Sequence, residues 1–407
     1  MNRIKNKEFD IIFFDTPFTQ LNRFCANIAR ELRIINPTIK IAAVVLVQAP
    51  KSNPIRMKDC PHSLLDIFDD IYLYSDIQNI DNFLINSKPK FLFFGANRIP
   101  DLEIVLHAKK IGIKTFSFQH GLYFNGCCIN EFNVHNSLLA MKTMDKVWNY
   151  LTTLQRMSKY DGTSFFRVLA RIFLKRGDLQ ALAMKSFSVP LNCDEAFIIG
   201  NYWRDYYTNI FSYDNSQLVL VGSHDLDCFN ENEKIEPAIC YIASTLVEEG
   251  SVTKKEFLRF IDALSETINK NTKLYIKLHP LSDRSLYEAL KNHNVVFLDK
   301  QGELPPVSVY ISNHSTLIGK ALYYSDQLII WQFKSEKNCF YGDYASFVCK
   351  TKSDLQNAIN KISITQITHE KKPLISNIYY KNPTGAFKAC ALHLNTFLLN
   401  NNNKGEM

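Results

Sequence analysis

Short runs of apolar, β-branched and aromatic residues recur along the first half of the chain, separated by helix-length segments. The strand-like runs are FDIIFFD (9–15), KIAAVVLV (40–47), DIYLYS (70–75), FLFFGA (91–96), KTFSFQ (114–119) and KVWNY (146–150). Between them, LNRFCANIARELRII (21–35) and DLEIVLHAKKIG (101–112) predict helices. Strands that are apolar throughout and alternate with helices indicate a parallel sheet covered on both faces.

The second half repeats this alternation. Its strand-like runs are AFIIG (196–200), QLVLVGS (217–223), KLYIKLHP (273–280), NVVFLD (294–299), VSVYIS (307–312) and QLIIWQF (327–333). A helix is predicted over KKEFLRFIDALSETINK (254–270), between two of these strands.

Two doubly wound, Rossmann-like α/β domains facing each other across a cleft account for this pattern, because 407 residues exceed what one hydrophobic core usually supports. We expect the first domain over residues 1–185, including a partly basic helical excursion over about 151–185. The second domain is expected over 186–384, followed by a closing helix and a frayed tail at 385–407.

Composition and charge narrow the classes of function. The chain carries 47 Lys and Arg against 40 Asp and Glu, mixed through most of its length, which disfavours a nucleic-acid partner. Ten cysteines show no zinc-like spacing and the N-terminus does not resemble a cleavable signal, so we expect reduced thiols in the cytoplasm. The apolar runs are far shorter than the roughly 20 residues that span a bilayer.

The segment SFFRVLARIFLKRG (164–177) combines apolar residues at helical spacing with a basic face. Such a helix can lie on an anionic membrane surface, which would place the protein on the cytoplasmic face of the inner membrane. A core helix with solvated cations on its outer side explains the same pattern. Both interpretations stay open at this stage.

Polar clusters lie at several predicted strand ends, where doubly wound sheets bind their ligands. At Gln119-His120-Gly121 the glycine permits a sharp exit from the strand and leaves the imidazole able to face a cleft. A histidine that fills space and bonds to backbone is the alternative. In KLYIKLHP, Lys277 and His279 are two residues apart, so their side chains point to the same face of the predicted strand. Pro280 ends this strand.

That second cluster suits a phosphate, with Lys277 as a fixed charge and His279 as hydrogen-bond donor or general acid to a departing phosphate oxygen. A third strand ends at Ser312, and Ser315-Thr316 then precede an apolar helix predicted over 317–324. Hydroxyls and unpaired N–H groups at a helix start form an anion site, although a plain N-cap without a ligand is the alternative.

A further strand exit, VLVGSHDLD (219–227), supplies Ser223 and His224. All of these exits except the one at His120 fall in the expected second domain, where they would surround one phosphate-bearing ligand. His120 would then face them from the first domain. Asp225-Leu226-Asp227 lies in no convincing metal-binding loop, and we expect neither a metal nor a cofactor.

With these residues in place, the sequence resembles GT-B glycosyltransferases of bacterial surface polysaccharide synthesis. Bacterial sialyltransferases and related ulosonic-acid transferases carry a His-Pro motif followed by a Ser-Ser/Thr motif, and His279-Pro280 and Ser315-Thr316 match that order. The resemblance implies that His279 protonates the departing CMP phosphate and that the two hydroxyls bind it. The stretch FFDTPFTQLN (13–22) is faintly similar to the start of lipooligosaccharide sialyltransferases.

This chain departs from the sialyltransferase pattern at the motif that would supply the catalytic base. Gln119-His120-Gly121 replaces the acidic motif of those sialyltransferases and is similar to a motif of CDP-glycerol glycerophosphotransferases and capsule Kdo transferases. His120 is therefore the candidate base for an inverting reaction, with Asp15 as second choice, and Gln119 and Gly121 would lie on the acceptor side. For a donor carboxylate, Lys277, Arg98 and Arg204 are candidate cations.

The expected function is transfer of a sialic-acid-like or Kdo-like sugar from a CMP-activated donor to a capsule, lipopolysaccharide or other surface glycan. Glycerophosphate transfer from CDP-glycerol uses the same histidines and the same anion site. A UDP-sugar 2-epimerase also has two Rossmann-like domains and needs no acceptor. A non-catalytic sugar-binding module is the last alternative.

Overall fold

The computed structural model describes residues 7–46, 55–95, 98–119, 144–175, 178–248, 250–279, 282–298, 303–313, 315–333, 340–362, 370 and 372–402. These residues form two compact units. The first contains the described residues up to 119, those from 144 to 224 and those from 381 onward, and the second contains those from 225 to 380.

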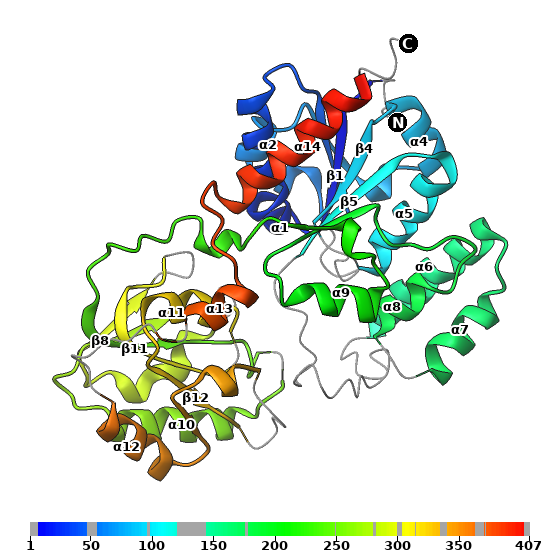
Figure 1. Ribbon diagram of the computed structural model, residues 1–407. Coiled ribbons are helices and arrows are strands. Elements are labelled where there is room, and N and C mark those ends of the chain that lie inside the picture. The colour runs from blue at the N-terminus through cyan, green and yellow to red at the C-terminus, as the bar shows by residue number, and fades with distance from the viewer. Residues whose placement is uncertain are drawn as a thin grey trace. The chain divides into compact units, whose positions relative to one another are not determined.

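The first unit is built on a seven-stranded parallel sheet in the order β3-β2-β1-β4-β5-β6-β7 (Figure 1). Its strands are β1 (Ile11–Asp15), β2 (Ile41–Val45), β3 (Asp70–Leu73), β4 (Phe91–Phe94), β5 (Lys114–Phe118), β6 (Glu195–Ile198) and β7 (Leu218–Leu220). Its helices are α1 (Phe18–Arg23), α2 (Cys25–Ile35), α3 (His62–Leu65), α4 (Ile80–Ser87), α5 (Ile99–Ile111), α6 (Met144–Asp161), α7 (Phe165–Leu174), α8 (Leu179–Met184), α9 (Trp203–Phe211) and α14 (Ala386–Asn402). Burial of β1, β2 and β4 on both faces explains their unbroken apolar sequences.

The second unit is built on a six-stranded parallel sheet in the order β10-β9-β8-β11-β12-β13. Its strands are β8 (Glu236–Ile242), β9 (Leu274–Lys277), β10 (Val295–Leu298), β11 (Val307–Ser312), β12 (Leu328–Trp331) and β13 (Phe347–Cys349). Its helices are α10 (Lys254–Thr267), α11 (Ile318–Tyr324), α12 (Lys352–Lys361) and α13 (Lys372–Ile378).

Both sheets follow one topology, in which the first strand of the unit lies between its second and fourth strands. This is the Rossmann order, and it reverses beside the first strand, between β1 and β4 in one sheet and between β8 and β11 in the other. The two predicted doubly wound domains are therefore confirmed. The reversal points are where such sheets bind ligands.

The division of the chain differs from the expected boundary at 185/186. The runs at 196–200 and 217–223 form β6 and β7, which extend the first sheet beyond β5 instead of opening the second one. Their apolar sequences identify strands but carry no information about the partner strand. The first domain consequently reaches residue 224.

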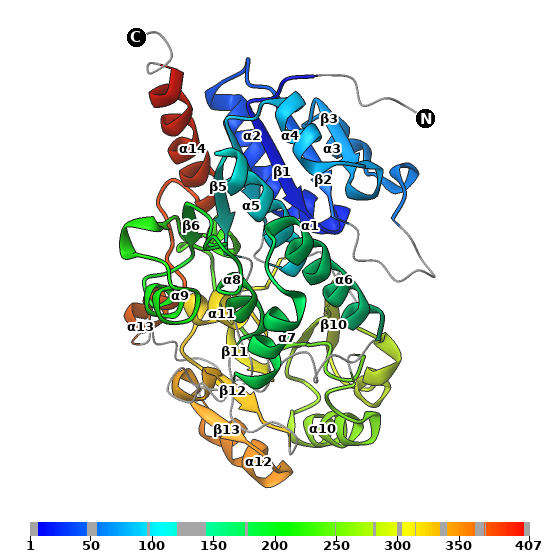
Figure 2. The same ribbon diagram turned by 90° about the vertical axis from the view of Figure 1, so that its right-hand side faces the viewer.

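One predicted strand is wrong, and the predicted closing helix is confirmed. The run 146–150, predicted as a strand, lies within the helix α6 (Figure 2). The buried side chains Leu154 and Met157 further along α6 continue a helical period. The closing helix is confirmed as α14, and it returns to the first unit, where it packs against α2 (Figure 1). Its Cys390, Leu394 and Leu398 join that unit's hydrophobic core.

The returning helix generates a stability prediction. Leu394→Ala removes a fully buried side chain from the first core and should lower the free energy of unfolding of that unit by about 2–5 kcal/mol. Leu392→Ala, on the same helix but 43% exposed, should change it by less than about 0.5 kcal/mol.

The measurement is urea unfolding followed by tryptophan fluorescence in a Trp331→Phe background, so that Trp148 and Trp203 report on the first unit alone. Equal effects of the two leucine substitutions would contradict the packing of α14 in this core.

Candidate functional site

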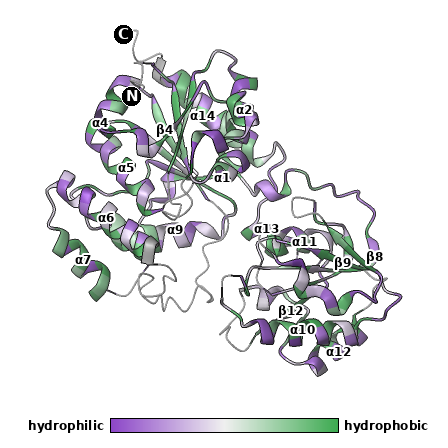
Figure 3. Cartoon of the chain, turned by 180° about the vertical axis from the view of Figure 1, so that it is seen from behind, coloured by the Kyte–Doolittle hydropathy of each residue, from purple (hydrophilic) through white to green (hydrophobic). Residues whose placement is uncertain are grey.

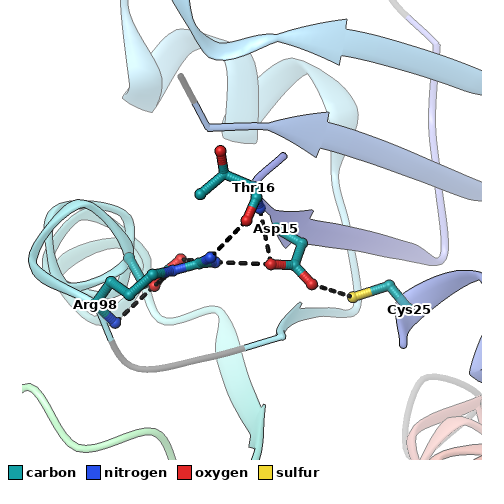
Figure 4. A network of polar contacts seen from close by, with 5 residues as sticks. Asp15, Thr16, Cys25 and Arg98 are labelled. Carbon is teal, nitrogen blue, oxygen red and sulfur yellow. Dashed lines mark hydrogen bonds and ion pairs between the residues drawn. The ribbon is translucent and has the colours of Figure 1, made fainter. Parts of the chain in front are cut away.

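Asp15 is the last residue of β1 and lies beside β4, where the strand order of the first sheet reverses. Its side chain is fully buried. Oδ1 accepts hydrogen bonds from the Thr16 backbone N–H at 2.7 Å and from Nη2 of Arg98 at 2.9 Å, and Oδ2 accepts one from Sγ of Cys25 at 3.7 Å (Figure 4). The reversal point of the first domain therefore holds a buried, fixed carboxylate.

Arg98 connects that carboxylate to the start of α5. Its Nε donates to Oδ2 of Asp101 at 2.8 Å, and its Nη1 donates to the Thr16 carbonyl at 2.9 Å. Asp101 also accepts the backbone N–H of Arg98 at 2.6 Å. Two buried carboxylates thus share one guanidinium, so the candidate cation Arg98 is already engaged within the first domain.

Burial raises the pKa of Asp15 and Asp101 above the ordinary range of aspartate, and the nearby charge of Arg98 opposes the rise. For Arg98 itself, burial acts to lower the pKa, but the charges of Asp101 and Asp15 outweigh it and hold it above the ordinary value. The pKa of Cys25 is raised by burial and by the Asp15 charge, so its thiol stays neutral and donates. A carboxylate with a raised pKa is suited to accept a proton.

Gly95 follows β4 and makes room for Asp15. A Cβ atom at this glycine would lie 2.1 Å from Oδ2 of Asp15, well inside van der Waals contact. The glycine in FLFFGA is therefore required by the close approach of the carboxylate and not by a turn. Sequence reasoning did not identify this residue, because its only signal is a glycine at a strand end.

Gln119 is fully buried after β5, and its contacts connect two strands. Its backbone N–H donates to the Phe197 carbonyl at 2.9 Å, and its side-chain oxygen accepts from the Ile199 N–H at 3.1 Å. These bonds tie the end of β5 to β6. The neighbouring candidates His120 and Gly121 lie outside the described residues.

Ser223 and His224 follow β7 in the first unit, which corrects their expected place among the phosphate-binding residues of the second domain. The imidazole of His224 lies against the rings of Phe24 and Phe387, with centroids 4.8 and 5.5 Å away. Arg204 also belongs to the first unit, where its guanidinium donates to the Leu218 carbonyl at 3.2 Å. Both residues are therefore part of the first domain and not of the second.

The carboxyl ends of β9, β8 and β11 lie side by side at the reversal point of the second sheet. Ile242 at the end of β8 pairs in register with Lys277 on one side and with Ser312 on the other. The Ser312 hydroxyl donates to the Ile242 carbonyl at 3.0 Å, and the Ala243 N–H donates to the Lys277 carbonyl at 3.0 Å. The structure therefore brings the second and third predicted clusters together at one edge.

Within this edge the predicted residues differ in exposure. His279 and Thr316 are exposed and Ser315 is half-buried, whereas Lys277 is only 4% exposed. Burial raises the pKa of the Cys240 thiol, and the backbone N–H and charge of Lys277 oppose the rise, which places the lysine beside this buried thiol. Lys277 is thus a buried cation at the strand end and His279 a solvent-accessible imidazole.

The helix after Ser315-Thr316 begins later than predicted. α11 starts at Ile318 with Leu317 at the N-cap, and the Ser315 hydroxyl accepts the Leu317 N–H at 3.3 Å without capping the helix. With only seven residues, α11 adds little as a dipole, so hydroxyls and not a helix terminus characterise this edge. Pro280 lies outside the described residues.

Aromatic and amide side chains that sequence reasoning missed hold this loop in place. The Asn313 amide donates to the Trp331 carbonyl at 2.9 Å and accepts from the Tyr241 hydroxyl at 2.7 Å. The Tyr379 hydroxyl donates to the Thr316 carbonyl at 3.1 Å. Large aromatic residues in apolar runs give no sequence signal that separates such support from ordinary core packing.

Among the residues that the structure describes, no group of three or more His, Cys, Asp or Glu is arranged to hold a metal ion. In the same part of the chain, no helix combines the length and apolar character needed to cross a bilayer.

The chain matches no protein-family model and no curated protein sequence. Among solved structures, the glycotransferase of kitacinnamycin superimposes with a TM-score of 0.55 at 10% identity, covering 96% of this chain and 100% of that one. UDP-GlcNAc 2-epimerase from Neisseria meningitidis, bound to UDP-GlcNAc, gives 0.50 at 11% identity and covers 95% and 99% of the two chains. A Medicago truncatula protein complexed with UDP-glucose gives 0.51 at 9% identity, covering 97% and 99%.

The chain has the GT-B fold. Superposition over nearly the whole length of each partner shows that both Rossmann-like domains belong to it. Identities near 10% establish this fold alone, so the choice of donor and of reaction in this GT-B chain rests on its own residues.

The contact between Gly95 and Asp15 generates a double-mutant prediction. Gly95→Ala should lower the free energy of unfolding of the first domain by about 1–3 kcal/mol, because the new methyl group overlaps the carboxylate. In an Asp15→Ala background the same substitution should cost much less, since the overlapping atoms are gone.

Urea unfolding of the four proteins, again in the Trp331→Phe background, gives the coupling energy. Additive effects of the two substitutions would show that Gly95 and Asp15 do not constrain each other.

Proposed function

We propose that this protein is a glycosyltransferase that uses a nucleotide-activated sugar, with the donor bound at the carboxyl ends of β8, β9 and β11. The observation that carries the proposal is that β9 and β11 pair with opposite sides of β8, with His279 following β9 and Ser315-Thr316 following β11. An exposed imidazole and accessible hydroxyls at the reversal point of a Rossmann sheet suit a phosphate. Lys277 adds a fixed positive charge beside them.

The proposed chemistry is displacement of a nucleotide phosphate by an acceptor hydroxyl. The acceptor oxygen forms a bond to the anomeric carbon as the bond from that carbon to the phosphate oxygen breaks. His279 donates a proton to the departing phosphate, while Ser315 and Thr316 donate hydrogen bonds to its oxygens. His120 or Asp15 takes the proton from the acceptor hydroxyl, and the raised pKa of Asp15 supports this role for a carboxylate.

The preferred donor in this proposal is a CMP-linked sialic-acid-like or Kdo-like sugar, and the acceptor is a capsule, lipopolysaccharide or other surface glycan. The order of His279-Pro280 and Ser315-Thr316 supports a cytidine nucleotide. Gln119-His120-Gly121 supports the related alternative, glycerophosphate transfer from CDP-glycerol. Since neither chemistry requires a metal to form its leaving group, we propose a metal-independent reaction.

A UDP-sugar 2-epimerase is the second candidate, because the N. meningitidis structure that superimposes on this chain is a UDP-GlcNAc 2-epimerase. An epimerase converts UDP-GlcNAc without an acceptor, so the two candidates differ in the nucleotide bound and in the requirement for a second substrate.

Nucleotide binding tests the proposal. CMP should raise the melting temperature of the protein more than CDP, UMP or UDP, and a ligand at a hundred times its dissociation constant adds about 2.7 kcal/mol of stability. His279→Ala should reduce the CMP effect and lower the transfer rate by about 10²- to 10⁴-fold, because it removes the general acid. His62→Ala, an exposed histidine on α3, is the matched control and should change neither.

A preference for UDP, together with epimerisation of UDP-GlcNAc followed by NMR, would replace the transferase with the epimerase. Stabilisation by CMP that survives His279→Ala unchanged would remove His279 from the proposed site.

We also propose that α7 attaches the protein to the anionic cytoplasmic surface of the inner membrane. α7 buries Val168 and Ile172 but exposes Phe166 (81%), Phe173 (46%) and Leu174 (83%). Figure 3 shows α7 largely in the hydrophobic colour. A core helix would not present three large apolar side chains to solvent. Arg167 and Lys175 are exposed on the same helix and its end, which supports binding to anionic lipid.

Vesicle co-sedimentation tests this attachment. The wild-type protein should sediment with phosphatidylglycerol-containing vesicles, and less so at high salt, because the cationic contribution is screened. Combined replacement of Phe166, Phe173 and Leu174 by alanine should abolish sedimentation, whereas Leu399→Ala, 54% exposed on α14, should leave it unchanged. Equal sedimentation of the triple variant and the wild type would contradict a role for α7.

A further inference from the structure

A groove of about 810 Å³ opens in the first domain beside the carboxyl ends of β2 and β3. Leu46 follows β2 and Tyr74 follows β3, and the remaining walls come from the start of α4, from α5 and from α6. The predicted site residues are not among those that line it. Its size falls within the roughly 300–1,000 Å³ of small-molecule sites.

One end of the groove is built around an ion pair between the buried Glu103 and the exposed Arg156. Glu103 on α5 is 2% exposed and accepts two hydrogen bonds of 2.7 Å from Nε and Nη2 of Arg156 on α6. Arg156 also donates to the Thr153 hydroxyl at 3.1 Å. The Tyr74 hydroxyl is hydrogen-bonded to Glu103, and burial followed by the charge of Glu103 raises the pKa of this tyrosine. The tyrosine is therefore a neutral donor at neutral pH.

The other end carries a second fixed polar cluster. Asp81, in the first turn of α4, lies 2.7 Å from Nδ1 of His107 and accepts from the Tyr160 hydroxyl at 2.9 Å. The imidazole of His107 stacks on the Tyr160 ring with centroids 3.7 Å apart. Packing of these groups against one another holds their orientations before any ligand arrives.

The charges of the lining nearly cancel, because Arg156 and Lys159 are matched by Glu103 and Asp81. This composition differs from that of the second domain's strand ends, where a cation, an imidazole and hydroxyls gather without a carboxylate among the predicted residues. An anion entering the groove would meet the carboxylates of Asp81 and Glu103, whose repulsion offsets the attraction of Arg156 and Lys159, so a phosphate or a sialylated ligand is disfavoured.

We propose that this groove binds a neutral glycan segment. The amide groups of Gln78 and Asn149 on the groove wall each carry two donors and an acceptor that suit the hydroxyls of a sugar. The ring of Tyr74 provides apolar surface for the C–H faces. The inference rests on the proposed function only in identifying this glycan as part of the acceptor.

The test uses the full chain and neutral oligosaccharides, maltopentaose and chitopentaose, with a sialylated oligosaccharide of similar length as the charged comparison. Saturation-transfer NMR should detect a neutral glycan in the millimolar range. Thr152→Trp, which fills the groove from α6, should weaken binding at least tenfold, and the smaller change Asn149→Ala about fivefold or more. Gln155→Trp, exposed on the same helix outside the groove, should leave binding unchanged.

No binding of either neutral glycan, tighter binding of the sialylated one, or unchanged binding in both groove variants would overturn the proposal. Nucleotide stabilisation, measured in parallel, separates this outcome from failure of the proposed function. Glycan binding without any nucleotide effect would leave the groove assigned and the transferase rejected, whereas a nucleotide effect without glycan binding would do the reverse.

Discussion

Parallel pairing of every strand in both sheets is the constraint on which the rest of this structure depends. A parallel sheet needs a crossover between successive strands, so helices cover both of its faces and its strands become apolar throughout. Charged side chains of the described strands then lie at the strand ends, as Asp15 and Lys277 do. In each domain the Rossmann order reverses next to the first strand, and the loops that leave there diverge to opposite sides.

The two reversal points carry different chemistry. In the first domain, the buried Asp15 and Asp101 both bond to Arg98 of the same domain. In the second, His279 and Thr316 are exposed after strands that pair with β8. A buried carboxylate with a raised pKa suits proton transfer, and an exposed imidazole with hydroxyls suits a phosphate. The proposed transferase reaction rests on this chemical difference between the two reversal points.

Sequence reasoning recovers the features that depend on local pattern. Apolar runs predicted most strands, and their alternation with helices predicted two doubly wound domains. Lys277 and Ser312, which were predicted to lie at neighbouring strand ends, both pair in register with Ile242. Sequence reasoning could not predict contacts between segments that are distant in the chain. β6 and β7 joined the first sheet, and α14 returned to the first core, because strand and helix sequences do not encode which neighbour they pack against. Gly95 and Tyr379 were missed for the same reason.

The central claim is that a nucleotide binds at the strand ends beside β8, and hydrogen exchange tests it most directly. Amides that contact or support a ligand exchange more slowly when it is bound. With saturating CMP, the account predicts slower exchange in peptides covering 277–283 and 312–319, and unchanged exchange in α12. Slower exchange confined to the first domain, or none at any nucleotide concentration, would contradict it.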